Sequence, residues 1–183
     1  MLFAPLIRPW AYLSIKPWNK QKITIDLVLP LLLSIICVVA VWYWSSFSSV
    51  FGSGKLIEKI TGFIQTLPGF YLAALSAIAT FNNPGMDQYL QGEPLKIKVV
   101  LNGAFETITL TRRRFLTTMF AYLTVQSFIA SMIGMVLISF DMTSLSKYYL
   151  AVAFFCFIYI IWQLLIITLW GIYYLGERIH TPN

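Results

Sequence analysis

The residues best able to do chemistry in this sequence are the basic side chains of one short polar segment. Arg112, Arg113 and Arg114 are consecutive, and Lys96 and Lys98 precede them in the same segment. Guanidinium and ammonium groups bind phosphates and carboxylates electrostatically. Two interpretations stay open: an anchor on lipid phosphates, and a seat for an acidic partner or for nucleic acid. Direct readout of a DNA sequence is not expected, because no recognition motif follows.

The sequence shows no pattern typical of a catalytic or metal site. Cys37 and Cys156 lie inside apolar runs without a CxxC motif, and His180 is the single histidine. A metal centre needs several converging ligands, and neither a nucleophile–base pair nor a phosphate-binding glycine loop is visible. We therefore expect no enzymatic activity, no catalytic residues, no metal and no cofactor. The cysteines are expected to act as small apolar side chains.

Four apolar runs must position the polar segment. They are Ile25–Trp44, Phe63–Phe81, Phe115–Phe140 and Tyr148–Leu175, and Asp26 is their one charged residue. A bilayer core of about 30 Å requires about 20 apolar residues as a helix, because backbone polar groups must be satisfied within the segment. At 58% hydrophobic and 11% charged residues, little of the chain is left for a soluble domain. The sequence predicts an all-α integral membrane protein, with four transmembrane helices in a single domain, residues 1–183.

Aromatic and basic residues predict how these helices are bounded. Residues 1–24 are expected to form an interfacial collar on the cytoplasmic surface, because prolines prevent one continuous helix and Trp10 and Trp18 prefer the headgroup region. Trp42 and Trp44 predict an aromatic belt at the opposite interface. Gly52–Thr61 is expected to be a short connection on that side. A kink is expected at Pro68-Gly69.

The distribution of lysine and arginine predicts the orientation. The N-terminal segment carries four, Asn82–Arg114 five and the C-terminal tail one, whereas the two opposite connections carry two and one. Cytoplasmic loops hold the excess of basic residues in membrane proteins. Both termini and the middle segment are therefore expected in the cytoplasm.

The cytoplasmic insert, residues 82–114, is expected to contain a β-hairpin over residues 95–111. Two β-prone runs flank Asn102-Gly103, the strongest short signal for a two-residue turn. Pairing Leu101 with Ala104 would place Ile97 opposite Ile108. A lone hairpin is marginal in water, so we expect support from helix ends, a sister subunit or a soluble partner. The predicted partner-binding residues are Lys96, Lys98, Asn102, Gly103, Phe105, Arg112, Arg113 and Arg114.

Small residues at helical spacing predict close contacts between helices. One set lies on the second helix and one on the third: Gly69, Ala73 and Ala77, and Ser127, Ser131 and Gly134. For the first set we favour packing within one subunit over an oligomer seam. Gln126 and Gln163 are expected to form interhelical hydrogen bonds, with a pore lining in an oligomer as the alternative.

The layout of the chain resembles the KwaA family, the membrane subunits of the bacterial Kiwa anti-phage system. The resemblance covers the basic, aromatic N-terminus, the insert YLQGEPLKIKVVLNGAFETITLTRRRF and the two long helices that follow. Its closest local match is LTRRRFLTTMFAYL, Leu110–Leu123. The resemblance implies a homo-oligomer, such as a tetramer, in the bacterial inner membrane. It also implies sensing of phage attack together with a cytoplasmic DNA-binding effector, KwaB, so that nucleic acid is contacted only through the partner.

The residues and the resemblance together predict a non-enzymatic inner-membrane scaffold and sensor that docks a KwaB-like effector on its insert. The alternative is an oligomeric channel that depolarises the membrane. A third hypothesis is an accessory subunit of a transporter or of an envelope-assembly machine.

Overall fold

A computed structural model of the chain describes residues 8–15, 20–44, 46–80, 84–89, 96–101, 104–140 and 145–180. Its elements, in chain order, are η1 (Arg8–Ser14), α2 (Lys20–Ile23), the π-helical η2 (Thr24–Val28), α3 (Leu29–Trp44), η3 (Phe47–Ser49), α4 (Leu56–Ile64), α5 (Leu67–Thr80), η4 (Pro84–Met86), β1 (Lys96–Leu101), β2 (Ala104–Thr109), α6 (Arg112–Ser139) and α7 (Lys147–His180).

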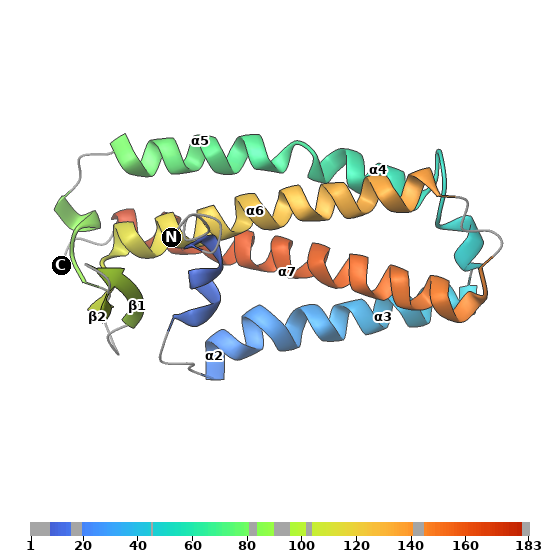
Figure 1. Cartoon of the computed structure of the whole chain (residues 1–183), viewed down its shortest axis with the longest axis horizontal. Coiled ribbons are helices and arrows are strands. Elements are labelled where there is room, and N and C mark those ends of the chain that lie inside the picture. The colour runs from blue at the N-terminus through green and yellow to red at the C-terminus, as the bar shows by residue number, and fades with distance from the viewer. Residues whose placement is uncertain are drawn as a thin grey trace.

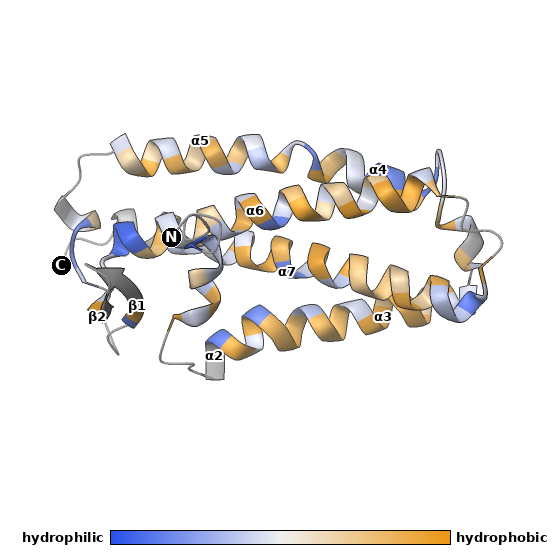
Figure 2. Ribbon diagram, in the orientation of Figure 1, coloured by the Kyte–Doolittle hydropathy of each residue, from blue (hydrophilic) through white to orange (hydrophobic). Residues whose placement is uncertain are grey.

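Four helical segments are long and apolar enough to cross a membrane: Thr24–Trp44, Leu56–Thr80, Arg112–Ser139 and Lys147–Leu175. They confirm the four apolar runs as helices and indicate a multi-pass membrane protein. In the most apolar part of the first segment, 17% of the residues are buried inside the protein. The helices are hydrophobic along most of their length (Figure 2). Many of their large apolar side chains are exposed, which gives a surface of the kind that a bilayer covers.

The helices run side by side, with α6 and α7 in contact along the middle of the bundle (Figure 1). α3 packs on α7, whereas α4 and α5 follow one another along α6. We call the end that carries η1, β1, β2 and the start of α6 the hairpin end, and the end that carries η3 and the start of α4 the far end. The buried side chains form one cluster toward each end.

The second apolar run begins earlier than predicted. The expected connection Gly52–Thr61 is wrong in its second half, because α4 begins at Leu56. Its buried residues are Ile57, Thr61 and Ile64, and this spacing places one face of a helix against the bundle. The turn before α4 needs positive φ angles at Gly52 (107°) and Gly54 (76°), which glycine adopts without strain.

A break in the second helix lies next to the prolyl residue, where a kink was expected. α4 ends at Ile64, and α5 begins at Leu67. Pro68 lies in the first turn of α5, where its missing N–H would have no helical partner. The spanning segment is therefore two consecutive helices.

The predicted hairpin and its register are confirmed. β1 and β2 pair antiparallel, with Leu101 opposite Ala104 and Ile97 opposite Ile108. Leu95 and the Asn102-Gly103 turn lie outside the described residues. Ile97 belongs to the same buried cluster as Leu110 and Tyr12. The hairpin is thus supported by the end of the bundle, one of the three supports expected for it.

Candidate functional site

The three arginines of the predicted binding site lie inside a helix. The apolar run suggested that they precede the third helix, but α6 begins at Arg112. Thr111 is the N-cap, and its Oγ1 accepts a hydrogen bond from the Arg114 N–H at 3.4 Å. Positive charge at a helix N-terminus opposes the helix dipole. Compensation therefore has to come from groups outside α6.

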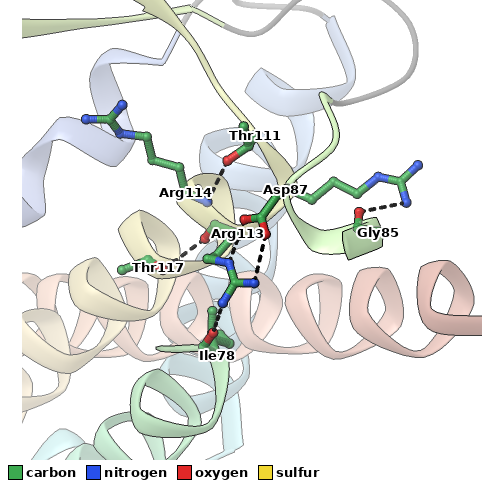
Figure 3. Close-up of polar contacts among 8 residues, drawn as sticks. Ile78, Gly85, Asp87, Thr111, Arg113, Arg114 and Thr117 are labelled. Carbon is green, nitrogen blue, oxygen red and sulfur yellow. Dashed lines mark hydrogen bonds and ion pairs between the residues drawn. The ribbon is translucent and has the colours of Figure 1, made fainter. Parts of the chain in front are cut away.

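Arg113 joins three parts of the hairpin end (Figure 3). Its Nε donates to Asp87 Oδ1 at 2.8 Å, and its Nη2 donates to Asp87 Oδ2 at 3.1 Å. Its Nη1 also donates to the carbonyl oxygen of Ile78, in the last turn of α5, at 3.0 Å. A planar guanidinium suits such a forked contact with a carboxylate. Arg113 therefore ties the start of α6 to the end of α5 and to the insert.

Arg112 and Arg114 have different surroundings. Arg112 is 7% exposed, and its Nη1 donates to the Gly85 carbonyl at 3.4 Å. Its backbone N–H donates to the Gln88 carbonyl at 3.0 Å. The Arg114 side chain is exposed and points away from Asp87 (Figure 3). Arg112 and Arg113 therefore bond other parts of the same chain, and Arg114 is exposed to solvent. The run of three identical residues does not reveal this difference.

The remaining predicted partner-binding residues are only partly described. Lys96 is exposed on β1. The structure describes the backbone but not the side chains of Lys98 and Phe105, and Asn102 and Gly103 lie outside the described residues. Of the predicted partner-binding residues, Lys96 and Arg114 are therefore the cations that the structure shows to be exposed, and Arg8 of η1 is a further exposed cation at the hairpin end. This exposed pair is smaller than the predicted patch.

The N-terminal segment enters the bundle, although a surface collar was expected. Tyr12 is 1% exposed, and Ile15 is also buried. The Tyr12 ring stacks on Tyr122 of α6, with ring centroids 5.2 Å apart. Trp10 is exposed, and its ring makes an edge-to-face contact with the Tyr122 ring, with ring centroids 5.7 Å apart. The segment is therefore held by aromatic packing.

A buried polar cluster lies beside this aromatic contact. Asp26, in η2, is 5% exposed, and its Oδ1 accepts a hydrogen bond from the Tyr12 hydroxyl at 3.2 Å. Lys22 Nζ donates to the carbonyl oxygens of Tyr12 at 3.0 Å and of Ile15 at 3.3 Å. Burial lowers the pKa of Lys22, and the charge of Asp26 opposes this shift. Burial and then the charge of Asp26 raise the pKa of Tyr12, so its hydroxyl stays a proton donor.

The cluster continues across the central helix pair. Gln163 Nε2 of α7 donates to the Asp26 carbonyl at 3.0 Å. Its Oε1 accepts from Gln126 Nε2 at 2.8 Å and from the Tyr122 hydroxyl at 3.3 Å. Gln126 and Gln163 were each expected to bond across helices, and they do so with one another. The Gln163 amide is thus fully bonded within one four-helix unit, whereas the Oε1 of Gln126 is buried without a hydrogen-bond partner among the described residues.

Sequence reasoning missed the centre of this cluster. In the sequence, Asp26 stands out only as the charged residue at the start of an apolar run. A signal was available, because Lys22 and Asp26 are four residues apart and therefore share one face of a helix. The position of Asp26 in a π-helical turn, a form frequent at functional sites, required the structure.

The two sets of small residues differ in burial. Ser127, Ser131 and Gly134 are buried, and a Cβ atom on Gly134 would overlap the side chain of Thr61. Close packing of α6 is therefore confirmed. Gly69, Ala73 and Ala77 are exposed on α5. Their packing within one chain, which we favoured, is wrong for the described residues, and the oligomer seam stays a prediction.

The predicted interface tryptophans that are described lie at both ends of the bundle. Trp10 is in η1 at the hairpin end, and Trp42 and Trp44 end α3 at the far end. All three are exposed, and Trp18 lies outside the described residues. Lys147 Nζ lies 4.9 Å from the ring centroid of Trp42. Aromatic rings and amines of this kind suit the two borders of a bilayer.

The arrangement offers exposed cations for binding and an arginine that links two helices to the insert. Within the described part of the chain, no three His, Cys, Asp or Glu side chains come together as metal ligands. The exposed cations can bind an acidic surface, and Arg113 connects that surface to two helices. Comparisons with models of protein families, with curated proteins and with solved structures found no match. The resemblance to the KwaA family therefore rests on the layout of the sequence alone.

Proposed function

We propose that this protein is a non-enzymatic scaffold and sensor of a bacterial inner membrane, which holds a cytoplasmic effector on its hairpin end. The observation that carries the proposal is the triple contact of Arg113. From α6, its guanidinium bonds the end of α5 and the carboxylate of Asp87. A shift of α5 against α6 would therefore displace the start of the insert.

The seating of the hairpin supports a role in presentation. Ile97 and Leu110 are buried in the cluster that contains Phe115 of α6. The hairpin is therefore fixed to the helices on one side. Lys96 and Arg114 remain exposed and match an acidic protein surface, since complementary charge guides partners into register.

The identity of the partner and of the stimulus comes from the resemblance to the KwaA family. On that basis, the partner is a KwaB-like DNA-binding effector and the stimulus is phage attack on the envelope. The excess of lysine and arginine in the N-terminal and middle segments supports a cytoplasmic hairpin end. Homo-oligomerisation, for example as a tetramer, belongs to the same proposal.

The channel alternative gains no support from the described polar side chains. It needs a continuous polar lining between subunits, and Gln126 and Gln163 were its candidates. Both are buried and bonded to one another within one chain. The scaffold is therefore the function that we propose.

Docking is tested by co-purification with the product of the neighbouring gene. Exchanging Lys96 and Arg114 together for Glu should weaken capture at least about tenfold, because two attractive contacts become repulsive. Exchanging Lys55 and Lys59 together for Glu, which makes the same charge change at the far end, should leave capture unchanged. Equal capture by all three proteins would remove the hairpin as the docking surface.

Sensing is tested separately with Arg113→Gln, which cuts the link to Asp87 but keeps Lys96 and Arg114. Cells that carry this variant and the partner should retain the complex and lose protection against phage, measured by plating efficiency. Full protection by Arg113→Gln would refute the transmission route. Absence of protection by the wild-type pair would refute the defence role itself.

A further inference from the structure

An apolar groove lies between α3 and α4 toward the far end and is floored by α7. Its volume is about 560 Å³, within the range of roughly 300–1,000 Å³ found for small-molecule sites. Representative lining residues are Cys37 and Val41 of α3, Ile60 and Phe63 of α4, and Ile158 and Trp162 of α7. Trp162 Nε1 donates to Cys37 Sγ at 3.4 Å. The indole N–H in the groove wall is thus already hydrogen-bonded. The groove therefore suits an apolar ligand.

The dimensions of the groove match one leaflet of a bilayer. Along α7 its lining runs from Phe154 to Leu165, which is roughly 16 Å at a rise of about 1.5 Å per residue. A bilayer core is about 30 Å thick, so each leaflet contributes about half of that. The length of the groove along α7 therefore matches the thickness of one leaflet. An acyl chain that enters from the far end can lie along it.

A single cation stands at the groove among its lining residues. Lys59, in the first turns of α4, is exposed and forms no ion pair with another described residue. The neighbouring carboxylate of Glu58 accepts a hydrogen bond from the Gly54 N–H. An ammonium group at this level complements a lipid phosphate and favours anionic headgroups.

We infer that the groove binds one acyl chain of an anionic phospholipid, with the headgroup phosphate at Lys59. Under the proposed orientation the lipid belongs to the leaflet opposite the effector. The inference does not depend on the docking of an effector. A lipid at this position fills the space between α3 and α4.

Photolabelling tests the site. The full-length protein is reconstituted in vesicles with phosphatidylglycerol that carries a diazirine in its acyl chain, and adducts are mapped by mass spectrometry. Adducts should concentrate on the lining of α4 and α7. Lys59→Gln should reduce them about fivefold, the effect of one lysine at an anionic surface, whereas Lys55→Gln at the same end should leave them unchanged.

A second variant tests the groove itself. Ala40 lines it on α3, and Ala40→Phe should displace the acyl chain from the groove. Labelling of the groove residues should then fall to the level seen at Leu72, an exposed residue of α5. Ala73→Phe, on the exposed face of α5, should preserve it. Equal labelling by a zwitterionic phosphatidylcholine probe, or no change in Lys59→Gln, would show bulk lipid and overturn the inference. Crosslinks between two copies at these positions, in place of lipid adducts, would also overturn it.

Discussion

The two ends of the bundle are stabilised by different kinds of contact. At the hairpin end, Tyr12, Asp26 and Gln163 come from three separate parts of the chain and are joined by hydrogen bonds and stacked rings. At the far end, the buried cluster is formed mainly by aliphatic and phenylalanine side chains. A close contact there between α4 and α6 depends on the missing side chain of Gly134. Polar groups therefore add hydrogen bonds to the apolar packing at the hairpin end, whereas the far end relies mainly on the close fit of apolar side chains.

This difference suits a division of roles. Directional hydrogen bonds have few alternative partners, so the hairpin end holds the N-terminal segment and the insert in one arrangement. Apolar packing in a membrane is less directional and relies on close fit. The far end can therefore leave an apolar groove without stranding a buried polar group there.

The largest test breaks the aromatic contact at the hairpin end. Tyr12→Ala removes a buried ring that stacks on Tyr122 and covers Lys22. It should lower the free energy of unfolding by about 3–5 kcal/mol, as for other large aromatic deletions. Tyr12→Phe, which removes only the bond to Asp26, should cost about 1 kcal/mol. Thermal unfolding of purified protein in detergent measures both, and equal losses would mean that the ring contributes little.

The second test attacks the close contact at the far end. Gly134→Ala places a methyl group against Thr61, whose branched side chain is held by a bond to the Ile57 carbonyl. Overpacking should outweigh the gain in helix propensity and destabilise by about 2 kcal/mol. At Gly171 the obstacle is the flexible end of Met119, so Ala should cost less there. Gly69→Ala meets open space and should be neutral or slightly stabilising, which makes it the matched control.

The third test removes the amide at the centre of the polar cluster. Gln163→Leu loses the bonds to the Asp26 carbonyl, Gln126 and Tyr122. At roughly 0.6 kcal/mol for each of these three bonds in a membrane protein, the loss should be about 2 kcal/mol. Gln65→Leu, at an exposed position between α4 and α5, should show no such loss. If the two variants unfold alike, the cluster does not stabilise the hairpin end.

The smallest expected effect is that of the ion pair at the base of the insert. The Arg113 and Asp87 side chains are 24% and 61% exposed, so solvent weakens the pair and Asp87→Asn should cost about 0.5 kcal/mol. Arg113→Gln also loses the bond to Ile78 and should cost about 1 kcal/mol. A double-mutant cycle of Asp87→Asn and Arg113→Gln, measured by thermal unfolding, separates the contribution of the ion pair from that of the bond to Ile78. Additive losses would show that the pair is not coupled.

Much of the fold was predictable because its signals are local. The four apolar runs and the Asn102-Gly103 turn signal led to the observed helices and to the strand register of β1 and β2. The early start of α4 was missed because Lys55 and Lys59 suggested an outer loop. The buried face at Ile57, Thr61 and Ile64 becomes evident only against a partner helix.

The candidate site was less predictable, since identical residues met different partners. Arg112, Arg113 and Arg114 are alike in sequence, but one is buried, one bonds Asp87 and one is exposed. Periodicity identified two stripes of small residues and could not say which of them packs within the chain. That choice depends on which helices become neighbours.

The sequence by itself determined the four apolar helices, the pairing of the two strands and the excess of positive charge near the insert. Each follows from neighbouring residues through hydrophobic length, turn geometry or charge. The tertiary structure alone decided that Tyr12 enters the bundle, that Gln163 bonds a carbonyl 137 residues away and that Gly134 admits Thr61. Hydrogen bonds and steric fit act over a few ångströms in space, so residues far apart in the chain acquire these roles only once the helices have packed.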